Sequence, residues 1–118
     1  MKTVLAVDDS RAMRSMVQQT LESGGFTVLL AEHGKEALAT LSNNKIDLIV
    51  TDINMPIMDG LTFIREVRKL DTNIPILALT TEAEAGIKQT GNGLGADGWI
   101  VKPFQPAQFL DIVRQMVE

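Results

Sequence analysis

Residues 3–9 read TVLAVDD, a run of apolar and β-branched side chains that ends on two adjacent carboxylates. Residues 46–52, IDLIVTD, repeat the pattern and end on Asp52. Such short runs are typical of strands buried on both faces of a parallel sheet. Carboxylates at the ends of buried strands repel one another and lose hydration, so Asp8, Asp9 and Asp52 are expected to bind a cation or to carry out chemistry.

Strand-like runs and helical spacing alternate along the whole chain. Strands are expected at 3–7, 27–31, 47–51, 75–79 and 98–101. Helical periodicity predicts helices from a Ser10 or Asp9 cap to Gly24, over 34–43, after Gly60, between the last two strands, and from Pro106. Five strands alternating with five helices predict one doubly wound α/β sandwich over residues 1–118, with right-handed crossovers.

The composition describes an ordinary globular domain. The 118 residues are 45% hydrophobic and 22% charged, with a net charge of -4, which argues against broad affinity for nucleic acids. The one basic cluster, Arg65, Arg68 and Lys69, is interpreted as a solvated helix face. With no cysteine, no signal peptide and no apolar stretch of membrane-spanning length, the chain is expected in the cytoplasm.

Glycines interrupt the fourth expected helix. Gly86, Gly91 and Gly93 precede the fifth strand, and each glycine inside a helix costs about 1 kcal/mol relative to alanine. Two interpretations stay open. The helix is either short and mobile, or it is an ordinary helix that Ile87 and Leu94 stabilise by packing.

The polar groups at the strand ends suggest one kind of chemistry. Carboxylates alone offer oxygen ligands, which favour a hard divalent ion such as Mg²⁺. With the ion bound, one carboxylate can act as a nucleophile toward phosphorus. Lys102 and Thr80, which end two further strands, can neutralise and hydrogen-bond a phosphoryl group.

Four motifs in order carry a family resemblance. They are VDDS at 7–10, TDINMPIMDG at 51–60, LTT at 79–81 and GADGWIVKPF at 95–104. With these motifs the chain resembles the receiver domain of two-component response regulators, and within that family stand-alone chemotaxis regulators of the CheY type. The resemblance covers essentially the whole chain and implies a flavodoxin-like sheet with strand order 2-1-3-4-5.

The resemblance also implies site roles. Asp52 would accept the phosphoryl group. Asp9 would bind Mg²⁺ directly and Asp8 through water, while the main-chain carbonyl of Asn54 would complete the protein ligands. Lys102 would pair with the phosphoryl group.

Further roles follow from the same resemblance. Lys102 would precede a cis bond to Pro103, and Thr80 would be a switch hydroxyl. Trp99 stands at the switch-aromatic position, usually Tyr or Phe, and Glu82 flanks the phosphoryl site. Partners would be a sensor histidine kinase of the CheA type, a target such as the flagellar motor switch, and a phosphatase. With no output domain after Glu118, a monomer that signals by protein contact is expected.

Simpler or rival interpretations remain for several of these residues. Asp8 and Asp9 can cap the first helix, Trp99 can be mere packing, and His33 is interpreted as a residue at a helix start. Rival functions are a phosphate sink, a receiver from another pathway, a Mg²⁺-dependent phosphatase with an aspartate nucleophile, and a flavodoxin-like binding module. The DDSRA sequence after the first strand lacks the phosphatase pattern DxDx[TV] and would repel a flavin phosphate.

Overall fold

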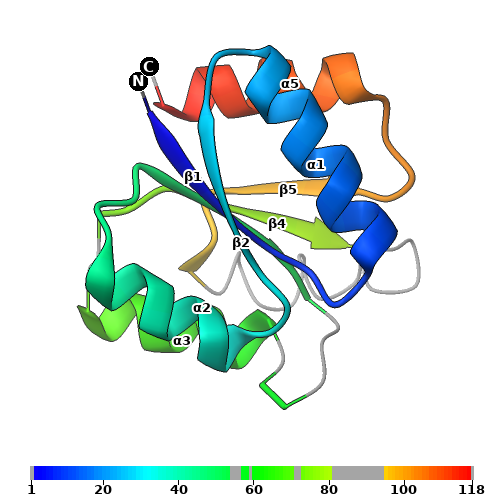
Figure 1. Ribbon diagram of the computed structural model, residues 1–118. Coiled ribbons are helices and arrows are strands. Elements are labelled where there is room, and N and C mark those ends of the chain that lie inside the picture. Colours follow the sequence, from blue (N-terminus) through cyan, green and yellow to red (C-terminus); the bar gives the residue numbers. More distant parts are fainter. Residues whose placement is uncertain (1, 54–56, 59, 71–72, 81–94, 118) are drawn as a thin grey trace.

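The computed structural model describes residues 2–53, 57–58, 60–70, 73–80 and 95–117. A five-stranded parallel sheet in the order β2-β1-β3-β4-β5 lies between two pairs of helices (Figure 1). The strands are β1 Thr3–Val7, β2 Thr27–Ala31, β3 Leu48–Asp52, β4 Ile76–Thr80 and β5 Gly98–Val101. The described helices are α1 Arg11–Ser23, α2 Gly34–Asn43, α3 Gly60–Leu70 and α5 Pro106–Val117.

This architecture confirms the predicted doubly wound sandwich and its strand order. Three of the five strands have the predicted bounds, whereas β3 and β4 begin and end one residue later than expected. Asp47 precedes β3, and its carboxylate accepts a hydrogen bond from Thr3 N at 2.8 Å. Pro75 has no N–H to donate to a ladder. The fourth expected helix, and the choice between a mobile and an ordered one, lie outside the described residues.

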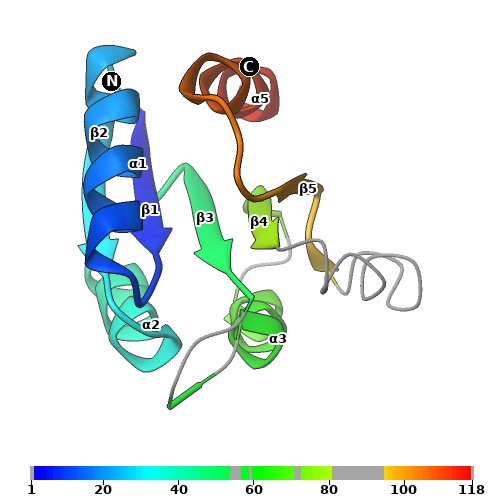
Figure 2. The same ribbon diagram turned by 90° about the vertical axis from the view of Figure 1, so that its right-hand side faces the viewer.

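The core is divided between the two faces of the sheet. Successive side chains of a strand point to opposite faces, so Leu5 and Val7 pack on the α2 and α3 side while Val4 and Ala6 pack on the α1 and α5 side. Figure 2 shows these two helix pairs on either side of the sheet. Met58 packs against the cluster on the α2 and α3 side, and Met116 packs against the cluster on the α1 and α5 side.

Side chains close the starts of two helices. Ser10 caps α1, its Oγ accepting from Met13 N at 3.2 Å, so neither Asp8 nor Asp9 supplies the helix cap. His33 caps α2, its Nδ1 accepting from Glu36 N at 3.1 Å, which confirms the predicted place at a helix start. Of the helices in the described ranges, none combines the length and the apolar character that a bilayer crossing requires.

Arg68 contradicts the prediction of a fully solvated basic face on α3. Its guanidinium donates to the carbonyl oxygens of Gly95 and Ile74, at 2.6 Å each through Nη2 and Nη1, and to Asp97 Oδ2 at 2.8 Å. The same Asp97 oxygen accepts from Ile76 N at 2.9 Å. Arg65 and Lys69 are exposed as predicted. Arg68 therefore ties α3 to the starts of β4 and β5.

Loss of the Arg68 hydrogen bonds to Ile74, Gly95 and Asp97 is expected to destabilise the domain. Arg68→Gln removes charge-assisted bonds to two main-chain carbonyls and one carboxylate, and a hydrogen bond to a charged group contributes about 1.5–3 kcal/mol net. Because Asp97 is about half exposed, water replaces part of this loss. We expect the free energy of unfolding to fall by about 2 kcal/mol in urea titrations. Arg65→Gln, on the exposed side of the same helix, is the matched control. An equal effect of both substitutions would show that only the charge of α3 matters.

Candidate functional site

Four strands bring polar residues to one edge of the sheet. Asp8 follows β1, Asp52 and Thr80 are the last residues of β3 and β4, and Lys102 follows β5. The strand arrowheads of Figure 2 point to this edge. Asp8, Asp52 and Thr80 are buried, with 3%, 4% and 1% of their surfaces exposed. The predicted juxtaposition of these four residues is therefore present in the structure.

Lys102 lies between two of the carboxylates. Its Nζ is 3.1 Å from Asp52 Oδ1 and 3.6 Å from Asp8 Oδ2. The Lys102 main chain is held as well, because its N–H donates to the Thr80 carbonyl at 2.6 Å. The peptide bond to Pro103 is cis, as the resemblance implied. The ammonium is thus directed at the two buried acids.

Arg14 holds the main chain between the paired aspartates. Its Nη1 donates to the Asp8 carbonyl at 2.7 Å, and its Nη2 lies 3.4 Å from Glu32 Oε1 beyond the end of β2. Ser10 N donates to Asp8 Oδ1 at 2.8 Å. Sequence reasoning did not identify Arg14. The available signal was its place one turn after the Ser10 cap, where a long side chain can reach back to the strand end.

Burial and charge shift the pKa values of two groups. Loss of hydration raises the pKa of Asp8; the carboxylates of Asp52 and Asp9 add to the rise, against the Ser10 hydrogen bond and the Lys102 charge. Burial alone would lower the pKa of Lys102, but its bond to Asp52 and the charges of Asp8 and Asp52 outweigh burial and raise it. Lys102 therefore stays protonated at neutral pH.

Asp8→Asn is expected to raise the Tm of the metal-free protein at pH 7. Because the pKa of Asp8 is raised above its ordinary 3.8, the folded state favours the proton. The resulting stabilisation is present below that value and is lost as the pH rises through the folded-state pKa, so the ionised carboxylate destabilises the fold at neutral pH. The measurement is Tm against pH in a chelator, with Asp47→Asn as control.

The pH dependence of the difference decides this prediction. The advantage of Asp8→Asn should shrink as the pH falls through the folded-state pKa and vanish below 3.8, where the wild-type carboxyl is protonated in both states. A pH-independent gain would indicate that repacking, and not charge, is responsible.

The three carboxylates fit a divalent cation. One oxygen from each of Asp8, Asp9 and Asp52 lies within 4.8 Å of the others, and Asp9 is exposed. In the described part of the chain Asp8 Oδ2 has no hydrogen-bond partner, although Lys102 Nζ lies 3.6 Å away. A buried oxygen of this kind costs free energy unless a cation or water compensates it. Oxygen donors on an open edge suit Mg²⁺, which retains several waters. Asn54 and Glu82, also predicted at the site, lie outside the described residues.

Trp99 occupies a place next to this edge. It lies on β5 opposite Ala78 of β4, is partly buried, and packs against the core cluster on the α2 and α3 side. Its Nε1 is buried and has no hydrogen-bond partner among the described residues. The indole is therefore packed inward, with an N–H that the described part of the chain does not satisfy.

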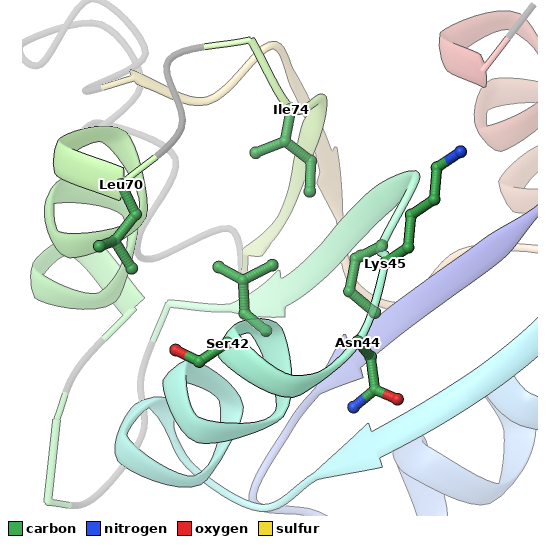
Figure 3. Close-up of a pocket in the computed structure, with 7 residues that line it drawn as sticks. Ser42, Asn44, Lys45, Leu70 and Ile74 are labelled. Carbon is green, nitrogen blue, oxygen red and sulfur yellow. The ribbon is translucent and has the colours of Figure 1, made fainter.

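A pocket at the opposite edge does not belong to this site. It has a volume of about 390 Å³ and lies between the ends of α2 and α3 (Figure 3). Its lining includes Leu41, Ser42, Lys45, Leu70 and Ile74. These residues end helices or precede strands, so the pocket opens at the amino edge of the sheet, away from Asp52.

Solved structures similar to this chain are signalling proteins. The chemotaxis protein CheY4 of Vibrio cholerae is 44% identical with a TM-score of 0.91, over 98% of both chains. The response regulator TrrA of Thermotoga maritima, solved in complex with Mg²⁺ and BeF, is 31% identical with a TM-score of 0.90, over 98% of this chain and 99% of that one.

Curated relatives point the same way. The response regulator MprA of Mycobacterium sp. (strain KMS) is 37% identical over 97% of this chain and 50% of its own length. The alkaline phosphatase synthesis transcriptional regulatory protein PhoP of Bacillus subtilis is 38% identical over 91% of this chain and 45% of its own. The chain thus spans about half the length of these relatives. Residues 4–114 match the family described as the response regulator receiver domain, and the chain belongs to that family.

Proposed function

We propose that this receiver domain accepts a phosphoryl group on Asp52 from a histidine kinase and passes the signal on by protein contact. The observation that carries the proposal is the contact of Lys102 Nζ with Asp52 Oδ1 at 3.1 Å, inside a group of three carboxylates. Buried ionisable groups paired in this way, at the end of a strand, are concentrated at functional sites.

Asp52 is the nucleophile in this proposal. A carboxylate oxygen of Asp52 bonds to phosphorus, the bond from phosphorus to the donor nitrogen breaks, and the leaving imidazole takes up a proton. Ile53 N donates to Asp52 Oδ1 at 2.9 Å and so fixes the carboxylate. The domain is consumed stoichiometrically, which makes it a phosphoacceptor with self-catalysed transfer and not an enzyme.

The remaining residues stabilise charge. Asp8, Asp9, Asp52 and the Asn54 carbonyl would hold Mg²⁺, which when bound offsets the negative charge of carboxylates and phosphoryl oxygens. Lys102 pairs with a phosphoryl oxygen in place of its present contact with Asp52. Thr80, at the end of the neighbouring strand, donates its hydroxyl to another oxygen.

Trp99 and Glu82 are proposed to transmit the change. Movement of Thr80 toward the phosphoryl group would open space beside β4, and Trp99 lies on the adjoining strand, where its Nε1 has no partner within the described ranges. An indole that gains a partner or solvent for this N–H in a second conformation lowers the free energy of that conformation. Glu82 is proposed to line the entrance to the phosphoryl site.

Chemotaxis is the pathway that we propose first. Its support is the 44% identity to Vibrio CheY4, a chain matched over 98% of its length. The donor would then be a CheA-type kinase and the target the flagellar motor switch, with a phosphatase to reset the signal. A receiver from another pathway, or a phosphate sink, is the second candidate, favoured by relatives such as MprA that are about twice as long. Binding of the beryllofluoride form to purified motor switch protein separates the two.

The phosphoacceptor proposal is tested by Trp99 fluorescence together with intact mass. Trp99 is the one tryptophan in the sequence, so its signal is unambiguous. We expect saturable quenching or enhancement with Mg²⁺ and then with beryllofluoride, and one phosphoryl adduct with acetyl phosphate and Mg²⁺ but not with EDTA. An adduct without a fluorescence change would remove Trp99 from the switch. Absence of both an adduct and metal binding would refute the proposal.

A further inference from the structure

Ile57 departs from what folding alone favours in two ways. Its φ is +70°, and it is the one non-glycine residue with positive φ in the described ranges. A branched Cβ makes this conformation unfavourable for an L-residue. Its side chain is also 75% exposed, so it gains nothing from burial. Glycine or asparagine would adopt the same backbone without either cost.

The segment around Ile57 is anchored on both sides. Gly60 N donates to the Ile53 carbonyl at 2.7 Å and closes the loop at its base, beside Asp52. Met58 is partly buried and packs against the core cluster on the α2 and α3 side. Burial of Met58 holds this end of the segment against the core, but it does not account for an exposed isoleucine next to it.

The segment stands on the rim of the acidic site. In Figure 2 residues 57–58 form the short green stretch at the bottom, projecting beyond α2 and α3 on the side to which β3 points. Asp52 itself is only 4% exposed. A protein that delivers a phosphoryl group must therefore cover this rim, whereas a small phosphodonor can enter without touching it.

We propose that Ile57 is an apolar contact for the protein phosphodonor, burying its side chain when the donor covers the carboxyl edge. The inference rests on the proposed function. Strained, exposed residues at functional sites are retained where binding uses them, and an exposed apolar side chain stabilises a complex when a partner buries it. Ile57 follows the acceptor Asp52 closely in the sequence, so the protein that reaches Asp52 is the partner expected to bury Ile57.

The test compares two phosphodonors on the same variants. The probes are acetyl phosphate and an autophosphorylated CheA-type histidine kinase chosen because it phosphorylates the wild-type chain. Ile57→Asn keeps the positive φ but removes the apolar side chain. It should lower kcat/KM with the kinase at least about tenfold, equivalent to about 1.4 kcal/mol, and change the acetyl phosphate rate by less than about twofold. Ile57→Leu should restore transfer from the kinase.

Controls make each outcome decisive. Leu70→Asn removes another exposed apolar side chain, at the opposite edge of the sheet, and should leave both rates unchanged. Equal kinase rates for wild type and Ile57→Asn would overturn the inference while leaving the acceptor role intact. A parallel loss with both donors would instead indicate damage to the site. If neither acetyl phosphate nor any CheA-type kinase phosphorylates the wild type, so that no kinase can be chosen, the proposed function itself is refuted. A shift in oligomeric state with unchanged transfer would assign Ile57 to a contact between two copies.

Discussion

Asp52→Asn is expected to abolish formation of the phosphoryl adduct while leaving the domain folded. The amide is close in size to the carboxylate but lacks the anionic oxygen that attacks phosphorus, and removing a nucleophile commonly lowers rates by several orders of magnitude. Intact mass after incubation with acetyl phosphate and saturating Mg²⁺ should show an adduct for the wild type and none for the variant. The fold should survive because the variant also relieves repulsion with Asp8.

Substitutions of two other aspartates serve as controls for this result. Asp47→Asn alters a carboxylate at the amino edge, where it accepts from Thr3 N, and should leave the adduct unchanged. Asp9→Asn alters the exposed member of the acidic group and should slow the reaction in a way that high Mg²⁺ partly corrects. An adduct formed on Asp52→Asn at the wild-type rate would place the acceptor on another residue.

Gly60→Ala is expected to be the most damaging small substitution in the described part of the chain. A Cβ at this position would lie 2.6 Å from Ile53 Cα and 3.0 Å from the Asp52 carbonyl carbon, and it would meet the Asp52 carbonyl oxygen most closely of all. These are main-chain atoms at the end of a central strand, which cannot move aside as a side chain can. We expect a loss of about 3 kcal/mol or more and a Tm lower by about 10 °C.

Gly34→Ala is the matched control for this prediction. Gly34 is also buried and is the first residue of α2, as Gly60 is of α3. The nearest atom to its added Cβ would be Met58 Sδ at 2.9 Å, near the end of a flexible side chain. We expect a change within about 1 kcal/mol, because alanine also favours the helix. Equal unfolding midpoints for the two variants would mean that the main-chain atoms at the end of β3 shift at little cost in free energy.

The strands and the acidic edge could be predicted from the sequence because their signals are local. A run such as 3–9 carries its own period, burial and polar end, and parallel strands then place those ends together. The local pattern, without the family resemblance, could not tell which of Asp8 and Asp9 is buried. The structure does so because Asp8 N donates to the Ala31 carbonyl, continuing the sheet by one residue, while Asp9 turns out to solvent.

Contacts made by long side chains were not predictable in the same way. Arg14 and Arg68 resemble other basic residues on helical surfaces, and their partners Asp8 and Gly95 are fixed only when the elements pack. The positive φ of Ile57 also gave no signal, because isoleucine normally argues for extended or helical backbone.

The Arg68 hydrogen bonds are one of several contacts that hold the last strand and the last helix in place. The described residues from 95 onward contact elements that lie far earlier in the sequence. β5 pairs with β4, and Arg68 bonds to Gly95 and Asp97. Phe109 is buried in the core, and Leu110 lies over Gly24. β5 and α5 are therefore fixed in space by packing and hydrogen bonds to elements that precede them by many residues in the sequence.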